Sequence, residues 1–212
     1  MKALCISDIH GRLAFLSAVE NYLGENPPDL ILCCGDITNN GREVELCEKF
    51  IAIVRKLPFF FVPGNNEQGE IYDLFIEFSV EGKLREFKGE KIVGIGGIPD
   101  LYGHGIYPAK IPVKEMENSI FLSHIPPRNI ETIKKFDWTP EKSLDLKLSG
   151  APKIQISGHQ HNNWGVGWIG KTKILKLPAG TDMMVAELDT ESLAIEFIGL
   201  RKYDRINLEV IS

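Results

Sequence analysis

Short apolar runs that end in a polar side chain recur along this chain, and they constrain its fold more than any other feature. The first three runs cover residues 2–7, 30–34 and 59–62, and Asp8, Asp36 and Asn65 follow them closely. Segments with apolar residues at helical spacing lie after them, at about 13–23, 43–56 and 68–78. Strand and helix therefore alternate three times, which predicts an α/β fold with a parallel sheet covered on both faces.

The pattern changes after Leu84. Segments 84–87 and 91–95 flank Lys88-Gly89-Glu90, which predicts an antiparallel hairpin. The Gly- and Pro-rich segment 94–112 is expected to be a long loop, and segment 140–148 has helical character. Further strands are predicted at 120–122, 154–156, 172–177, 183–188, 193–198 and 206–210. No repeat or linker divides the chain, so we expect a single domain spanning residues 1–212.

Composition excludes several classes of protein. The net charge of -5 and the pI near 5.6 argue against a protein that coats nucleic acid or an anionic membrane surface. No apolar run approaches the roughly 20 residues that a membrane helix requires. Met1-Lys2 leads directly into a strand instead of a signal segment, so we expect a cytoplasmic protein. The four cysteines lack the paired spacing of a zinc ribbon and are expected to be buried thiols.

Polar side chains at strand ends indicate a binding site. Ligands of open α/β sheets bind outside the carboxyl ends of the strands, where Asp8, Asp36 and Asn65 are expected, and His124 and His159 follow two later strands. Singly, an Asp can be a helix N-cap, an Asn a turn residue and a His a hydrogen-bonded core group. As a set, imidazoles and carboxylates at one edge are costly to bury without a cation. The pattern therefore predicts a metal site.

The order of these motifs resembles a known family. Asp-Xaa-His, Gly-Asp, Gly-Asn-Xaa-Glu, a strand-end His and Gly-His-Xaa-His follow one another between Asp8 and His161, as in the calcineurin-like metallophosphoesterase superfamily. The resemblance implies a four-layer α/β/β/α sandwich with two central mixed β-sheets, and a hydrolase with two divalent metal ions. Mixed nitrogen and oxygen ligands suit Mn, Fe, Co, Ni or Zn. By this resemblance the first metal is bound by Asp8, His10 and His161, the second by Asn65, His124 and His159, and Asp36 bridges both.

The reaction that the resemblance implies is hydrolysis of a small phosphate ester. Two adjacent cations bind phosphoryl oxygens and lower the pKa of a shared water, so we expect direct attack of a metal-bridging hydroxide on phosphorus. Many family members carry a His that assists the leaving group where this chain has Asn66. Because Asn cannot deliver a proton as imidazolium does, phosphodiesters or activated phosphomonoesters are the expected substrates. Asn66 either hydrogen-bonds the phosphate or is a plain turn residue.

Several residues outside the ligand set have more than one interpretation. His104, in the Gly- and Pro-rich segment, either replaces the missing acid or is an exposed loop residue. Arg128 is a candidate for substrate phosphate, since its guanidinium matches phosphate geometry. Arg12 either neutralises a carboxylate or contacts phosphate. Glu67 is expected to hold its loop and not to bind metal. Trp164 and Trp168 either stack on a nucleobase or pack a hairpin against the sheet.

Two other functions compete with a small-molecule phosphoesterase. A non-catalytic scaffold of the same fold predicts eroded metal ligands, whereas all seven positions here carry side chains that can coordinate a metal. A nuclease acting on DNA or RNA ends predicts a basic stripe, which this acidic chain lacks. The sequence leaves open the physiological substrate, the identity of the metal and the oligomeric state.

Overall fold

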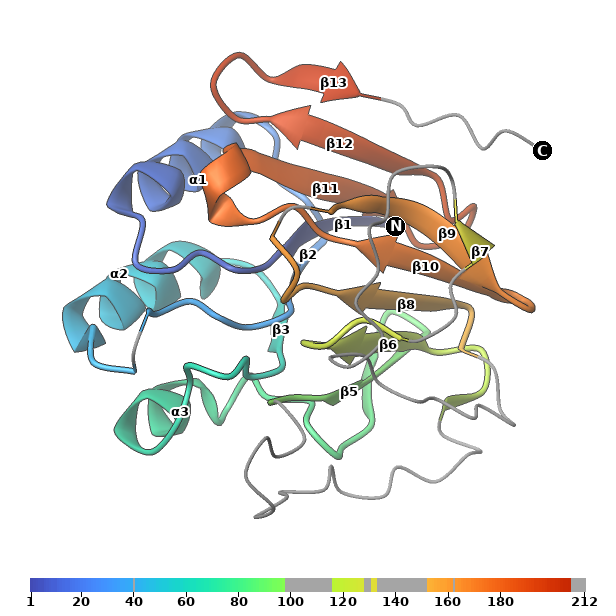
Figure 1. Ribbon diagram of the computed structural model, residues 1–212, viewed down its shortest axis with the longest axis horizontal. Coiled ribbons are helices and arrows are strands. Elements are labelled where there is room, and N and C mark those ends of the chain that lie inside the picture. Colours follow the sequence, from blue (N-terminus) through green and yellow to red (C-terminus); the bar gives the residue numbers. More distant parts are fainter. Residues whose placement is uncertain (40, 98–115, 128–130, 133–151, 162, 207–212) are drawn as a thin grey trace.

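The computed structural model describes residues 1–39, 41–97, 116–127, 131–132, 152–161 and 163–206. Within these residues, α1 (Leu13–Glu25), α2 (Val44–Val54) and α3 (Glu70–Phe75) alternate with the first three strands. Two β-sheets lie beside them (Figure 1). The first has the order β13 (Asp204–Ile206), β12 (Ile195–Gly199), β11 (Met184–Asp189), β1 (Lys2–Ile6), β2 (Leu30–Cys33), β3 (Phe59–Phe61).

The second sheet is also mixed. Its order is β4 (Arg85–Phe87), β5 (Glu90–Ile95), β6 (Ile120–Ser123), β8 (Ile154–Ser157), β10 (Thr172–Lys176), β9 (Gly165–Ile169), β7 (Glu131–Thr132). Strands β5, β6, β8 and β10 are parallel. On the two sides of this group, β4 pairs with β5 and β9 pairs with β10, and both pairs are antiparallel. In the first sheet β1, β2 and β3 are parallel, as predicted, and β11 and β12 are antiparallel to their neighbours. The predicted β4–β5 hairpin is confirmed.

Alternating side chains of the central strands pack in two different cores. In β1, Leu4 and Ile6 belong to the cluster that includes apolar residues of α1 and α2, whereas Ala3 and Cys5 belong to the cluster between the two sheets. The helices thus cover one face of the first sheet, and the second sheet covers the other (Figure 1). This arrangement confirms the α/β class and the two mixed central sheets. The predicted helix at 140–148 lies outside the described residues.

Some predicted boundaries were wrong. The third helix was expected at 68–78 but comprises only Glu70–Phe75. It begins late because Gly69 has φ of 53° and does not continue a right-handed helix, and residues 76–78 form a turn. Strand β9 was missed, since its two glycines resemble a loop; it forms through backbone pairing with β10. The last described strand ends at Ile206, while the strand predicted at 206–210 falls mostly outside the described residues. The ring of Trp164 packs 4.7 Å from that of Phe197, which supports its packing role.

The remaining global predictions concern cysteines and membrane spans. All four cysteines are buried and free, as predicted. Among the described helices, none is long and apolar enough to cross a membrane.

Candidate metal centre

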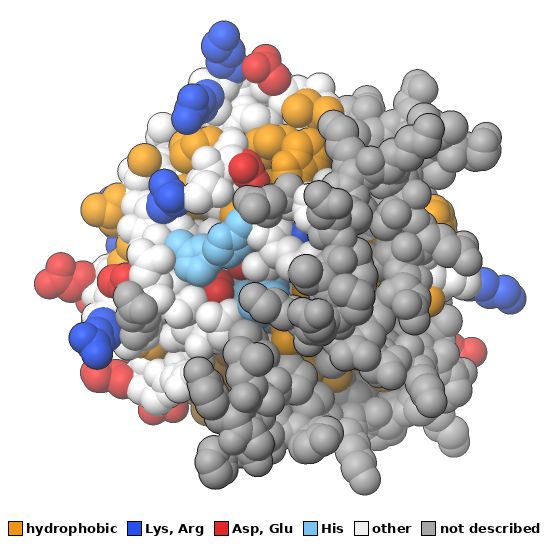
Figure 2. Space-filling view, viewed as in Figure 1, with side chains coloured by type: hydrophobic (Ala, Val, Ile, Leu, Met, Phe, Trp, Pro, Cys, Tyr) orange, Lys and Arg blue, Asp and Glu red, His pale blue; other side chains and the backbone are white. Residues whose placement is uncertain are grey.

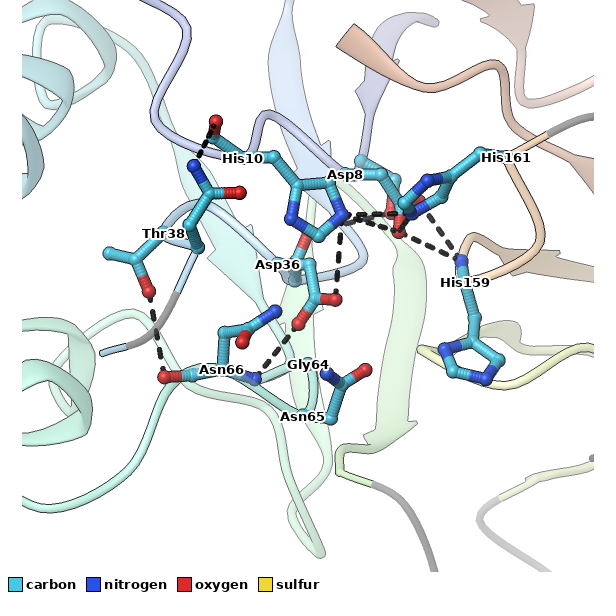
Figure 3. Close-up of polar contacts among 12 residues, drawn as sticks. Asp8, His10, Asp36, Thr38, Gly64, Asn65, Asn66, His159 and His161 are labelled. Carbon is cyan, nitrogen blue, oxygen red and sulfur yellow. Dashed lines mark hydrogen bonds and ion pairs between the residues drawn. The ribbon is translucent and has the colours of Figure 1, made fainter. Parts of the chain in front are cut away.

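Loops from both sheets converge on one region of the molecule (Figure 3). Asp8 follows β1, Asp36 follows β2 and Asn65 follows β3 in the first sheet, while His124 and His159 follow β6 and β8 in the second. Because parallel strands place their carboxyl ends at the same edge, these loops lie side by side. The structure thus brings together all seven residues that were predicted as ligands, namely Asp8, His10, Asp36, Asn65, His124, His159 and His161.

One part of this region is the Asp8 group, which consists of Asp8, His10 and His161. The Nε2 atoms of His10 and His161 lie 2.8 Å apart, and Asp8 Oδ1 lies 3.3 Å from His161 Nε2 and 3.8 Å from His10 Nε2. Atoms that bind one ion at about 2.1 Å are separated by roughly 3 Å. The spacing of the Asp8 group therefore suits a single divalent cation.

The second part is the Asp36 group, which consists of Asp36, His124 and His159. His124 Nε2 lies 3.1 Å from His159 Nδ1, 3.5 Å from Asp36 Oδ2 and 3.0 Å from Oδ1 of Asn65. Asp36 Oδ2 also lies 3.7 Å from His10 Nε2 in the Asp8 group. The Asp36 carboxylate therefore stands between the two groups, where it can reach a cation in either.

The orientation of His124 is set by the backbone of the first sheet. Its side chain is fully buried, and its Nδ1 lies 2.7 Å from the carbonyl oxygen of Cys34. A carbonyl can only accept, so Nδ1 carries a proton, and loss of the second proton from Nε2 on cation binding would leave its lone pair facing the Asp36 group. No sequence signal could have found this partner, because any residue at position 34 would supply the same carbonyl.

Buried carboxylates and imidazoles in this region shift one another's pKa values. Burial alone opposes ionisation of Asp8, but hydrogen bonds with His10 and His161 and the charge of His124 outweigh it and hold the pKa of Asp8 well below its usual range. Burial likewise opposes protonation of His124. The hydrogen bond and charge of Asp36 outweigh it and raise the pKa of His124 to about 9. The two carboxylates therefore attract positive charge, which a bound cation would supply.

Backbone strain is concentrated at the same residues. Asp8, His10, Asp36 and His159 have φ of 53°, 48°, 52° and 72°, in the left-handed region that L side chains rarely adopt. Each such residue costs about 1–3 kcal/mol, and strain of this kind gathers at functional sites. The surrounding structure must therefore stabilise these conformations.

A glycine precedes each of three candidate ligands because the loops pack too closely for a side chain. A Cβ atom at Gly64 would lie 2.1 Å from Asp36 Oδ1, and one at Gly158 would lie 2.3 Å from Asp8 Oδ2. A Cβ atom at Gly35, which has φ of 85°, would lie 2.1 Å from the backbone nitrogen of Gly64. The Gly-Asp, Gly-Asn and Gly-His motifs thus have a steric origin.

Glu67 holds the two loops of the first sheet together, as predicted. Its Oε2 accepts hydrogen bonds from the backbone N–H groups of Asp36, at 2.7 Å, and Gly64, at 2.8 Å. Its Oε1 accepts from those of Ile37, at 2.9 Å, and Thr38, at 3.2 Å. Burial and the charge of Asp36 raise the pKa of the Glu67 carboxyl. The hydroxyl of Thr38 also donates to Oε1, at 3.4 Å, so Glu67 holds the loops in position and belongs to neither group of candidate ligands.

Of the remaining candidates, the structure places Asn66 at the site. Its backbone N–H donates to Asp36 Oδ1 at 2.9 Å, and its side chain lies on the side of the loop that faces Asp36 (Figure 3). Arg12 is exposed immediately before α1. The candidates His104 and Arg128 lie outside the described residues.

The donor set suits divalent cations. Figure 2 shows imidazoles at the surface of this face with acidic side chains beside them. Both groups consist of imidazole nitrogens and carboxylate oxygens, and an amide oxygen lies next to the Asp36 group. Mixed nitrogen and oxygen ligands of this kind suit first-row transition metals. A two-sheet α/β sandwich with such a centre at its loop edge defines a class of metal-dependent hydrolase.

Comparison with known families specifies this class further. The family model described as calcineurin-like phosphoesterase matches residues 1–163, which is more than half of the chain. The chain therefore belongs to the calcineurin-like phosphoesterase family.

Individual relatives agree with this assignment. The chain is 32% identical over 193 residues to the uncharacterized protein MJ1162 of Methanocaldococcus jannaschii, and the alignment covers 82% of this chain and 87% of that protein. The crystal structure of TT1561 of Thermus thermophilus has a TM-score of 0.72 at 17% identity, covering 94% of this chain and 99% of that one. A structure described as a novel archaeal phosphodiesterase has a TM-score of 0.56 at 14% identity, covering 93% and 99%. The two structural matches show the shared fold.

Proposed function

We propose that this protein is a binuclear metal-dependent phosphoesterase that hydrolyses phosphodiesters or activated phosphomonoesters. The observation that carries the proposal is the position of Asp36, whose Oδ2 lies 3.5 Å from His124 Nε2 on one side and 3.7 Å from His10 Nε2 on the other. A carboxylate between two groups of imidazoles is suited to joining cations about 3.5–4 Å apart. Membership of the phosphoesterase family supplies the reaction class.

In this proposal the two groups bind one cation each. The Asp8 group holds the first, the Asp36 group with Asn65 holds the second, and Asp36 bridges them. Manganese, iron, nickel, cobalt and zinc all suit these ligands. When bound, two such cations offset charge on a phosphoryl group and make hydroxide available near neutral pH.

The chain's own residues position the reactants. The imidazoles and carboxylates would hold the cations in place for in-line attack of hydroxide on phosphorus, and no protein nucleophile takes part. The Asn66 amide donates a hydrogen bond to a phosphoryl oxygen but supplies no proton to the leaving group, so esters with good leaving groups react best. Trapping of a covalent phospho-enzyme during turnover would contradict this route.

The test is a panel of mono- and diesters assayed with Mn²⁺, Ni²⁺, Zn²⁺ or Mg²⁺, comparing wild type with Asp36→Asn. We expect metal-dependent hydrolysis of bis-aryl phosphodiesters and a loss of at least about 100-fold in Asp36→Asn, since even outer-shell changes cost up to that much. Asp29→Asn is the matched control, because Asp29 is a partly exposed aspartate paired with Lys88. Full activity in Asp36→Asn would refute the bridging role.

The proposed substrate class has its own test at Asn66. The Asn66→His variant restores an imidazole that can donate a proton, so hydrolysis of alkyl monoesters should rise by at least about tenfold. Bis-aryl diesters, whose leaving groups need no proton, should change little. Wild-type enzyme that prefers alkyl monoesters over bis-aryl diesters would overturn the substrate assignment.

The place of action is proposed to be the cytoplasm, with a small phosphate ester as the partner. The support is that all four cysteines are free, as in proteins of a reducing compartment. A non-catalytic scaffold is less well supported, because all seven candidate ligands are present and converge.

A further inference from the structure

Lys176, at the end of β10, is a fully buried lysine next to the metal centre. Its Nζ donates to the backbone carbonyl oxygens of Gln160 and Asn163. The parallel pairing of β10 with β8 places Lys176 opposite Ser157, immediately before the loop that carries His159 and His161.

The two carbonyls have a direct relation to the candidate ligands. Gln160 lies between His159 of the Asp36 group and His161 of the Asp8 group, and Asn163 lies two residues after His161. A hydrogen bond to the Gln160 carbonyl therefore restrains the backbone on both sides of it. His159 has φ of 72°, so this part of the loop is strained and needs such a restraint.

Burying an ammonium group is costly, which argues that Lys176 has a specific task. Burial lowers the pKa of Lys176 to about 7 against the opposing attraction of Asp8 and Asp182. A buried lysine is tolerated where its donors meet acceptors, and the loop carbonyls are such acceptors. An apolar side chain at this position would leave these carbonyls without the ammonium group.

We propose that Lys176 is a positioning residue of the metal centre, which orients His159 and His161 by holding the backbone carbonyls between and after them. This inference rests on the proposed function, because it assumes that the two histidines bind cations. Lys176 itself contributes no ligand atom. Its effect should appear in metal affinity, as expected for partners that orient ligands from outside the coordination sphere.

Lys173 provides a matched control on the same strand. Its Nζ donates to the carbonyl of Leu193 at 2.6 Å and lies 5.6 Å from the centre of the Trp168 ring, away from the ligand loop. Both lysines lie in β10, and burial lowers the pKa of both. A general loss of strand stability should therefore appear in the variants of both residues. Of the two, Lys176 is the one that contacts the segment between the histidines.

The experiment measures Mn²⁺ binding to metal-free protein by electron paramagnetic resonance, together with circular dichroism. Lys176→Met should bind Mn²⁺ about 10–100-fold more weakly than wild type. Lys173→Met should bind as wild type does, and Lys176→Gln, which keeps N–H donors, should lie in between. If Lys176→Met does not fold, Lys176→Gln is compared with wild type in its place.

Each outcome bears on one claim. Wild-type affinity in Lys176→Met, or in Lys176→Gln where only that variant folds, would overturn the positioning role while leaving the metal centre intact. Equal weakening in Lys173→Met would also overturn it, since strand stability would then explain the effect. Failure of wild-type protein to bind any divalent metal would remove the proposed function and this inference together.

Discussion

The two sides of the candidate metal centre are held by residues of opposite charge. On the side of the first sheet, the Glu67 carboxylate accepts hydrogen bonds from the backbone N–H groups of Asp36 and Gly64 and of the residues after Asp36. On the side of the second sheet, the Lys176 ammonium donates to the backbone carbonyls of Gln160 and Asn163. We call Glu67 and Lys176 the two anchor residues. Each is a buried charged side chain that hydrogen-bonds to the backbone of a loop carrying candidate ligands.

The anchors differ in how far along the chain they act. Glu67 lies three residues after Gly64 and contacts both its own loop and the loop after β2. Lys176 lies in a different strand from the loop it holds, 16 residues from Gln160. A local motif can therefore contain the first anchor, whereas the second becomes an anchor only through the pairing of β10 with β8.

The largest expected effect comes from breaking the first anchor. In Glu67→Gln, an amide NH₂ replaces a carboxylate oxygen and faces backbone N–H groups, so these donors lose their acceptor. The substitution should therefore lower the free energy of unfolding by about 3 kcal/mol. Urea unfolding in EDTA measures this loss without contributions from metal. The exposed Glu48→Gln in α2 is the control and should change stability by less than about 0.5 kcal/mol. A loss no greater than that of the control would show that Glu67 is not an anchor.

A somewhat smaller effect is expected from the close contacts on each side. Gly64→Ala forces a Cβ atom against Asp36, and Gly158→Ala forces one against Asp8, so each should cost about 2 kcal/mol by urea unfolding. Gly24→Ala is the control, because a Cβ atom there has no neighbour within 4 Å and lies within α1, where Ala is preferred to Gly. Stability equal to wild type in either loop variant would mean that the loops on that side can separate enough to accommodate the Cβ atom.

The anchors also differ in how pH affects stability. The pKa of Lys176 is about 7 in the folded protein and 10.5 in its ordinary state, so between these values the unfolded chain binds more protons. The stability of wild type in EDTA, taken relative to that of Lys176→Met, should therefore rise with pH from 7 to 10 by up to roughly 3 kcal/mol. Only this difference isolates Lys176, because the raised pKa of His124 is common to both proteins. Glu67→Gln should follow the wild-type curve in parallel. Parallel curves for wild type and Lys176→Met would show that the ammonium is not desolvated.

Much of the fold could be predicted because its signals are local. Three alternations of strand and helix predicted the parallel strands β1, β2 and β3, which the structure confirms. The hairpin of β4 and β5 was visible in its turn residues. Strand β9 was not visible in the sequence, because Gly165 and Gly167 are not typical strand residues. They pair with β10 only when the sheet has formed.

The candidate site shows the same division. Motif order predicted which side chains come together: Asp8, His10 and His161 form one group, and Asp36, His124 and His159 form the other, with Asn65 beside it. The carbonyl of Cys34 that orients His124 could not be predicted, because a backbone carbonyl carries no sequence signal. Lys176 was also missed, since a lone lysine in an apolar strand is typical of a residue at a sheet edge.

The sequence by itself determined the kind of donor atoms and their positions at strand ends, because those depend on residue type and on short apolar runs. Only the tertiary structure decided how the donors are oriented. Three features arise from contacts between distant segments: the left-handed backbone at Asp8 and Asp36, the glycines packed against carboxylates, and the buried charged side chains that hold the loop backbones. Such contacts exist only after two sheets pack together, which is why the sequence predicted the donor atoms of the candidate site but not its geometry.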